Sequence, residues 1–325
     1  MNGTTPDRAR RLHLIVAGLN GTRDDWPRQA PALAALLARG RGQAGTASLT
    51  ELIAQAFGLD AGIAALALAG EGLDPGTDVW LRADPVSLRF YQDRLILLDP
   101  RRLSLRPEET GALVQTLNRH FAADGLVIHA PRPERWYLRL PAGLTPPLAE
   151  PVDALIGRPL DQHLPGGAAA AFWRSRLTEA QMLLHDHPVN QTRESQGLPP
   201  INSVWFWGAG RVAPLTGHAF RQVVADHALA RALATAAGSE CLGLDRLPAL
   251  ESLTAAMVVV ELPEDDAEQC AAALGACEAR IFRPALHGLK RGRWQTVTVA
   301  SAAPLSIASR LTPLDAWRFW RRVHG

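Results

Sequence analysis

Short apolar runs alternate with stretches of helical character along most of this chain, and that alternation limits the folds it can adopt. Residues 12–19 and 257–262 are mostly apolar runs of the length of buried strands, interrupted by His13 and Glu261 respectively. Residues 30–39 and 267–277 instead have the length and composition of helices. Because strands and helices that alternate in sequence form a sheet covered by helices, the pattern predicts an α/β protein.

The middle of the chain has a different texture, with shorter apolar runs that lie closer together. This pattern predicts short strands at residues 79–82, 88–91, 95–98, 126–129 and 136–140. A helix between them is expected to begin at Pro107 and to end near residue 122, since proline is tolerated in a first helical turn. Another helix is predicted where four apolar side chains recur on one face, namely Trp173, Leu177, Ala180 and Leu184.

Proline and glycine cluster between residues 141 and 167, which marks a surface connection or the edge of a domain. Beyond this cluster the sequence predicts strands at 204–207, 281–283 and 296–300, and helices at 220–236 and 314–323. The simplest organisation is an α/β core of residues 1–77 and 203–325, interrupted by a smaller inserted domain of residues 78–202.

Composition narrows the classes of partner. Of the 325 residues 20% are charged, and the formal net charge of +2 does not suggest a general nucleic-acid binder. Cys241, Cys270 and Cys277 are too few for a disulfide framework and match no zinc spacing, which favours a reducing compartment. The apolar run at 61–70 is too short to span a bilayer. We therefore expect a cytoplasmic protein with neither nucleic acid nor a membrane as its partner.

The densest group of polar residues precedes the strand predicted at 204–207. His187, Asn190, Arg193 and Asn202 lead into a run that ends in Gly-Ala-Gly. Arginine contacts phosphate or carboxylate with two nitrogens at once, and glycines let backbone N–H groups approach an anion. The group is typical of a site for an anionic substrate. A surface loop followed by a core strand explains the same residues, and both interpretations stay open.

Other candidate motifs favour structural roles. His185 and His187 are two possible metal ligands where known sites need three or four. The pair Asp226-His227 lies within a predicted alanine-rich helix, as a solvated or capping pair. The glycines at 208 and 210 lack the third glycine of a dinucleotide-binding loop. Residues 317–322 are expected to form a helix that docks through its Trp and Phe side chains, rather than to contact nucleic acid.

The stretch from His185 to Arg211 resembles the archaeal-type cofactor-independent phosphoglycerate mutases. That family has His-Pro-Val-Asn, an arginine three residues on, and an asparagine before a hydrophobic strand that ends in Gly-Ala-Gly. Arg82-Ala83-Asp84 and Arg135-Trp136-Tyr137-Leu138 are similar to segments of its inserted domain. The whole chain also resembles the bacterial RpfE-type regulatory proteins. The resemblance, specific over residues 78–210, implies an alkaline-phosphatase-like core sheet flanked by helices, with an inserted α+β cap domain.

The same resemblance implies two metal ions, usually manganese or zinc, held by Asp and His, and a Ser or Thr that accepts the phosphoryl group. This chain departs from that requirement. Ala17-Gly18 replaces the family's Asp-Gly after the first strand. Where the family has its later histidines and aspartates, this chain has Glu261, Asp265, Asp266 and Gln269, and then Ala300-Ser301-Ala302-Ala303-Pro304. We therefore predict no catalytic residue, no metal ligand and no cofactor.

Together these observations predict a degenerate phosphoglycerate-mutase-like protein. It is expected to be a non-catalytic regulatory protein that binds a phosphorylated or anionic small molecule or a protein partner. One alternative is an active cofactor-independent mutase or phosphatase with an atypical site, and another is an interaction protein whose inserted domain is only a scaffold. The candidate ligand-binding residues, expected to line one cleft, are Arg82, His187, Asn190, Arg193, Asn202, Gly208, Gly210 and Arg211.

Overall fold

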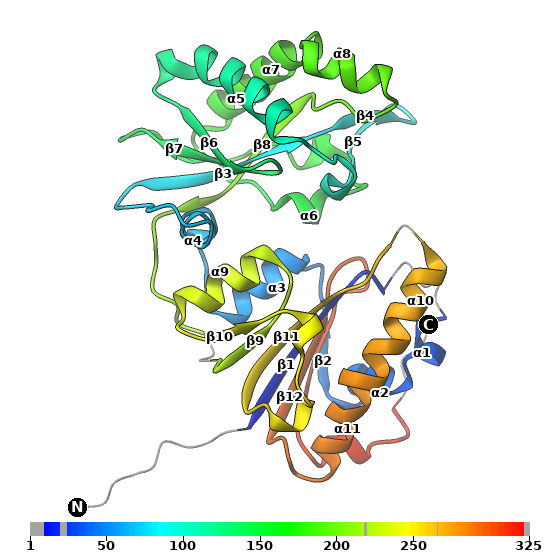
Figure 1. The fold of residues 1–325 in the computed structure, drawn as a ribbon. Helices are drawn as coiled ribbons and strands as arrows, with labels where there is room; N and C mark the ends of the chain where they lie inside the picture. Colours follow the sequence, from blue (N-terminus) through cyan, green and yellow to red (C-terminus); the bar gives the residue numbers. More distant parts are fainter. Residues whose placement is uncertain (1–9, 20–24, 218–219, 265, 322–325) are drawn as a thin grey trace, which may run out of the picture. The chain divides into compact units, whose positions relative to one another are not determined.

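The computed structural model describes residues 10–19, 25–217, 220–264 and 266–321 (Figure 1). The chain forms two compact units, the first from residues 1–58 and 215–325 and the second from residues 59–214. These boundaries differ from the expected 77/78 and 202/203, because the flanking segments pack within the second unit. Helix α4 (Ile63–Gly70) contacts β3 (Val79–Val86) and β8 (Ser203–Gly210), and β8 pairs with β3.

A seven-stranded sheet with the order β10-β9-β11-β1-β12-β13-β2 forms the centre of the first unit. Neighbours from β10 to β12 are parallel, whereas β13 is antiparallel to both β12 and β2. The strands are β1 (Arg11–Ala17), β2 (Arg41–Ala44), β9 (Gln222–Val224), β10 (Glu240–Leu242), β11 (Ala255–Glu261), β12 (Thr296–Ser301) and β13 (Ile307–Leu311). The runs predicted as strands at 12–19, 257–262 and 296–300 are thus its three central strands.

Helices cover both faces of this sheet (Figure 1). One face packs against α1 (Trp26–Gln29), α2 (Pro31–Arg39), α10 (Ala267–Cys277) and α11 (Arg283–Lys290). The other face carries α3 (Leu49–Ala56), which contacts β1, and α9 (Ala228–Ala236), which contacts β9. The prediction of an α/β protein with a central sheet flanked by helices is therefore confirmed.

The second unit is built on a four-stranded antiparallel sheet with the order β6-β7-β3-β8. A separate hairpin of β4 (Leu88–Tyr91) and β5 (Arg94–Leu97) follows β3. The remaining elements are α5 (Pro107–Phe121), β6 (Val127–Arg132), β7 (Arg135–Leu140), α6 (Val152–Leu155), α7 (Ala170–His185) and α8 (Pro188–Ser195). The four apolar residues that predicted one face of α7 are all buried.

Three predicted elements are wrong. The helix at 220–236 begins only at Ala228, because Gln222–Val224 pairs as β9 between β10 and β11. The strand at 281–283 is a π-helical turn, Glu278–Phe282, that continues into α11 with Pro284 in its first turn. In place of the helix at 314–323 there is a single 3-10 turn, Asp315–Trp317, and the chain to residue 321 is not helical. Within the described residues, no helix has both the length and the hydropathy of a membrane span.

Candidate functional site

The carboxyl ends of β1, β11 and β12 lie side by side in the first unit, where open α/β sheets bind their ligands. Ala17 pairs with Glu261 and Val16 with Ser301. The ladder continues one residue further on each side: the Leu262 N–H donates to the Ala17 carbonyl (3.0 Å) and the Ala302 N–H to the Val16 carbonyl (2.8 Å). The three strands therefore end at one level of the sheet.

The side chains at this level are poor metal ligands. Ala17 and Ala302 offer carbon atoms only, and Glu261 is the single carboxylate that pairs in register with Ala17. The Ser301 hydroxyl donates to the Leu305 carbonyl and accepts from the Ile307 N–H (3.1 Å), and the Leu262 and Ala302 side chains are buried. Gly18 has φ +84° and lies so close to Leu262 that a Cβ would stand 2.5 Å from the Leu262 carbonyl oxygen. Among the described residues, no three His, Cys, Asp or Glu side chains gather closely enough to hold a metal ion. Since a metal centre needs three or four ligands, the residues at these strand ends do not fit the manganese or zinc pair that the resemblance implies. Asp265, which the sequence analysis compared with the family's ligands, lies outside the described residues.

The pair Asp226-His227 lies in the connection between β9 and α9 rather than within a helix. His227 precedes the first residue of α9, and an Asp226 Oδ1 accepts a hydrogen bond from the Leu244 N–H (3.2 Å). The prediction that the pair lies within a helix is therefore wrong. His227 does occupy the N-cap position of α9, as the alternative of a capping pair expected.

In the second unit, Arg82 lies at the centre of a polar cluster on β3. Arg82 and Asp84 are two residues apart on one strand and so share a face of the sheet. The Arg82 Nε donates to Asp84 Oδ1 (3.0 Å), and one terminal nitrogen of Arg82 binds the same oxygen. The other terminal nitrogen donates to the Tyr137 hydroxyl (3.0 Å), and Trp207 Nε1 donates to Asp84 Oδ2 (2.6 Å). The guanidinium carbon also lies 4.8 Å from the centre of the Tyr137 ring, so the cation is held by charge, hydrogen bonds and an aromatic face.

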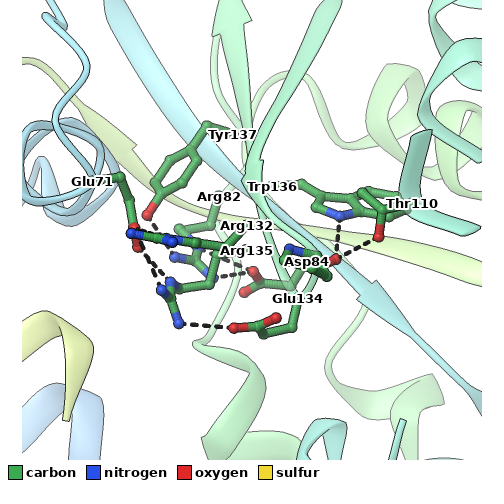
Figure 2. A network of polar contacts seen from close by, with 10 residues as sticks. Glu71, Arg82, Asp84, Thr110, Arg132, Glu134, Arg135, Trp136 and Tyr137 are labelled. Carbon is green, nitrogen blue, oxygen red and sulfur yellow. Dashed lines mark hydrogen bonds and ion pairs between the residues drawn. The ribbon is translucent and has the colours of Figure 1, made fainter. Parts of the chain in front are cut away.

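A second group of charges lies beside this cluster, across Tyr137 (Figure 2). Arg132 Nε donates to Glu71 Oε2 (3.1 Å), and Arg135 binds both oxygens of the same carboxylate. Burial alone would raise the pKa of Glu71, but the hydrogen bonds and charges of Arg135 and Arg132 outweigh it and lower that pKa. Burial raises the pKa of Tyr137 to about 12. The Glu71 carboxylate is therefore ionised and Tyr137 is neutral at ordinary pH.

The candidate residues on α8 are held by the protein's own groups. His187 precedes the helix, where its Nδ1 accepts from the Val189 N–H (3.3 Å) and its Nε2 lies 3.0 Å from the Thr116 hydroxyl. Burial lowers the pKa of His187. Arg193 is fully buried and donates to the carbonyls of Pro199 (2.8 Å) and Leu103 and to Glu109 Oε2 (2.9 Å).

Three asparagines each replace a missing strand partner by binding the N–H and C=O of a single residue. Asn190 accepts from the Ile201 N–H (2.8 Å) and donates to its carbonyl (2.9 Å). Asn202 does the same with Leu88, at 2.7 and 2.8 Å. Asn118, on α5, does so with Ile128, at 2.7 and 2.9 Å. A carboxamide has one acceptor and one donor side by side, so it matches a peptide group.

The remaining candidates lie at the other end of β8. A Cβ on Gly208 would be 3.7 Å from Arg82 Cγ, Gly210 packs against Gly62, and Arg211 Nε donates to the Thr77 carbonyl (2.7 Å). Trp207, which opposes Arg82, follows Asn202 by five residues, and so roughly 16 Å of strand separates the two groups. The structure thus brings Arg82 together with the glycines but separates it from the α8 residues. Binding of an anion by either group stays a prediction.

Sequence reasoning did not place five residues of the Arg82 region in the candidate site: Glu71, Asp84, Arg132, Arg135 and Tyr137. For Asp84 a signal was present, because two opposite charges two residues apart in a strand must face the same side. Glu71 gave no such signal, since its ion pairs with Arg132 on β6 and Arg135 on β7 depend on where α4 packs.

Comparison with known proteins supports a relation to one group of enzymes. No family model matches the chain. It is 26% identical over 193 residues to the 2,3-bisphosphoglycerate-independent phosphoglycerate mutase of Methanothrix thermoacetophila, covering 50% of this chain and 49% of the relative. It is 23% identical over 258 residues to a probable enzyme of the same name from Geobacter sulfurreducens, covering 70% of this chain and 63% of the relative. The chain is thus similar to these mutases.

A solved structure gives a weaker likeness over a longer span. The cofactor-independent phosphoglycerate mutase of Thermoplasma acidophilum aligns with 94% of this chain and 90% of its own, at 15% identity and a TM-score of 0.43. By sequence, the chain spans about half the length of the first curated relatives it matches.

Proposed function

We propose that this chain is a phosphoglycerate-mutase-like protein that does not catalyse phosphoryl transfer and instead regulates by binding a phosphorylated small molecule. The observation that supports this is that the ends of the central strands carry Ala17, Leu262 and Ala302 and, as a single carboxylate, Glu261, where a metal centre needs three or four ligands. A metal-assisted transfer needs a cationic clamp on the phosphoryl oxygens, and these side chains cannot hold one. The proposal agrees with the resemblance to the RpfE-type regulatory proteins.

The arginines of the second unit supply the anion-binding chemistry. Arg132 is 58% exposed at its side chain, and with Arg135 it forms a pair of guanidinium groups around one carboxylate. A phosphate ester carries more charge than Glu71 and accepts the same bidentate hydrogen bonds. We infer that a phosphorylated ligand replaces Glu71 on these two arginines, next to Arg82. Of the residues predicted from the sequence, only Arg82 belongs to this site.

Catalysis is tested on the full chain with 3-phosphoglycerate, by coupled detection of 2-phosphoglycerate with and without added manganese. We expect no turnover above that of a mock purification. Turnover of about 1 s⁻¹ or faster, within the range of ordinary enzymes, would restore the alternative of an active mutase.

Binding is tested by calorimetry with 3-phosphoglycerate, using variants expected to act in opposite directions. Arg132→Ala removes one charge-assisted contact and should weaken binding roughly 10- to 150-fold. Glu71→Gln removes the competing negative charge and should strengthen binding. Arg158→Ala, which breaks the exposed pair with Glu150 in the same unit, is the matched control and should change nothing. Equal affinities of Arg132→Ala, Glu71→Gln and the parent protein would refute this site.

A further inference from the structure

Residues 314–321, here called the aromatic segment, expose an unusual amount of apolar surface on the first unit. The exposed fractions are 59% for Trp317, 73% for Phe319 and 67% for Trp320, and 82% for Leu314. The sequence analysis expected a helix here that buries its aromatic rings. The structure instead places those rings outside the core, so the segment needs another explanation.

The backbone of the aromatic segment is fastened to the sheet. Asp315 accepts hydrogen bonds from the N–H (2.9 Å) and hydroxyl (2.7 Å) of Thr312. Arg39 donates to the Ala316 carbonyl (2.8 Å), and Arg321 donates to the Gly40 carbonyl (3.0 Å). These bonds hold both ends of the segment, so the rings are presented to solvent by an anchored chain.

Positive charge surrounds these rings. Lys290 Nζ lies 5.3 Å from the centre of the Trp317 ring, and Arg310 on β13 pairs in register with Arg41 on β2. Arg318 forms an ion pair of 2.9 Å with Asp315, whose carboxylate is buried. Arg318 and Arg321 lie within the segment itself, and Arg41 is close enough for its charge to lower the pKa of Asp315. Any partner that covers the rings must therefore tolerate, or supply charge for, a cationic rim.

In place of the expectation from composition that no membrane is a partner, we propose that the aromatic segment binds the surface of an anionic lipid bilayer. Trp317, Phe319 and Trp320 then lie at the boundary between headgroups and acyl chains. Tryptophan concentrates at that boundary because its ring is apolar and its N–H is polar. Basic side chains near an anionic surface each contribute about 1 kcal/mol, which is roughly a fivefold change in binding.

Other occupants fit this surface less well. Two copies of the chain in a symmetric contact would bring identical cationic rims against each other. Single-stranded nucleic acid stacks its bases on aromatic rings, but the aliphatic Leu314 side chain gains nothing from stacking. A bilayer accommodates the leucine, the aromatic rings and the arginines together.

The test is sedimentation of the full chain with vesicles of phosphatidylcholine, alone or mixed with phosphatidylglycerol. We expect binding to the anionic vesicles with a blue shift of tryptophan emission, and little binding to the neutral ones. Raising salt from about 0.1 M to about 1 M shortens the Debye length from about 10 Å to about 3 Å and should weaken binding. The triple variant Trp317→Ser/Phe319→Ser/Trp320→Ser should bind at least about tenfold more weakly, since even one buried ring contributes that much.

The matched control is Phe90→Ser/Tyr91→Ser, which removes two exposed rings from the β4–β5 hairpin of the second unit and should leave vesicle binding unchanged. Thermal unfolding followed by circular dichroism checks that both variants fold. The proposal is overturned if the parent ignores anionic vesicles or if the triple variant binds them as well as the parent. It is also overturned if the triple variant abolishes a dimer seen by sedimentation equilibrium, or if a single-stranded oligonucleotide binds the segment more tightly than vesicles do.

Discussion

Replacing Asn190 by aspartate should destabilise the second unit strongly, although the two side chains have almost the same shape. Asn190 is 1% exposed. Its amide nitrogen donates to the carbonyls of Leu184 (2.7 Å) and Ile201 (2.9 Å), and its oxygen accepts from the Ile201 N–H (2.8 Å). An ionised aspartate keeps the single accepted bond, loses both donated bonds and directs a negative charge at two carbonyl oxygens.

The magnitude follows from burial. Each lost hydrogen bond contributes about 1 kcal/mol, and a buried charge left without a partner raises the total to roughly 3–5 kcal/mol at pH 7. Because burial disfavours the charged form, the folded pKa of the new aspartate lies above its unfolded value of about 3.9. The deficit in stability is therefore smallest below pH 4 and grows by about 1.4 kcal/mol per pH unit until the folded pKa is reached.

Urea unfolding between about pH 3.5 and about pH 8, followed by tryptophan fluorescence, measures both the loss of stability and its dependence on pH. Gln191→Glu makes the same change of charge at the next residue, which is exposed on α8, and should cost less than about 0.5 kcal/mol. Asn190→Ala removes the same bonds without adding charge, so its deficit should not depend on pH. A deficit of Asn190→Asp that is below about 1 kcal/mol, or that does not grow with pH, would refute the role of Asn190 as a peptide substitute.

Three further predictions concern buried groups. In a Tyr91→Phe variant, the ultraviolet absorbance of tyrosinate should report Tyr137 alone, with a midpoint at about pH 12. Because the pKa of folded Tyr137 lies above the unfolded value of about 10, stability should be lost as the pH rises from the unfolded pKa to the folded one. Glu278→Ala should cost about 2 kcal/mol in thermal or urea unfolding, because the buried Glu278 carboxylate accepts from two N–H groups in the first turn of α2, at 3.0 and 3.3 Å, and Glu278→Gln should recover part of that loss. Arg193→Ala should lower Tm with a loss of about 3–5 kcal/mol, because the buried Glu109 keeps the hydrogen bond from the Arg106 N–H but loses its counter-charge. Calorimetry should find the affinity for 3-phosphoglycerate unchanged.

Helices and strands could be predicted where their own residues carry a periodic or apolar pattern. They could not be predicted where the conformation depends on pairing or packing with other elements. Apolar runs specified β1, β11 and β12, because a strand buried on both faces is mostly apolar. The three residues of β9 carry no such signal and adjoin an alanine-rich helix, so only their pairing with β10 and β11 makes them a strand. The segment at 281–283 was misread for the same reason, since a short apolar run before a proline is compatible with a strand and with a helical turn.

The candidate site was harder to predict, because one residue type serves two purposes. Asparagine and arginine before a glycine-rich strand are the right groups to bind an anion, and they are equally the right groups to satisfy backbone atoms that a turn leaves unpaired. Sequence spacing does not distinguish these roles. Asn190, Asn202 and Arg193 show the second role in the structure, because their hydrogen bonds run to backbone groups and to Glu109.

This distinction changes what the similarity to the phosphoglycerate mutases means. The stretch that resembles the mutases, residues 185–211, contains the groups that tie α8, the hairpin and β8 into one unit. The packing of that unit is sufficient to account for its pattern. On the proposal above, phosphoryl transfer would need metal ligands at the ends of β1, β11 and β12, where Ala17 pairs with Glu261 and Ala302 follows Ser301. A chain can therefore keep the first pattern after losing the second. On the proposal that this chain is non-catalytic, adding metal ligands to α8 should therefore produce no phosphoryl transfer, because the strand ends that would hold the metal belong to the other unit.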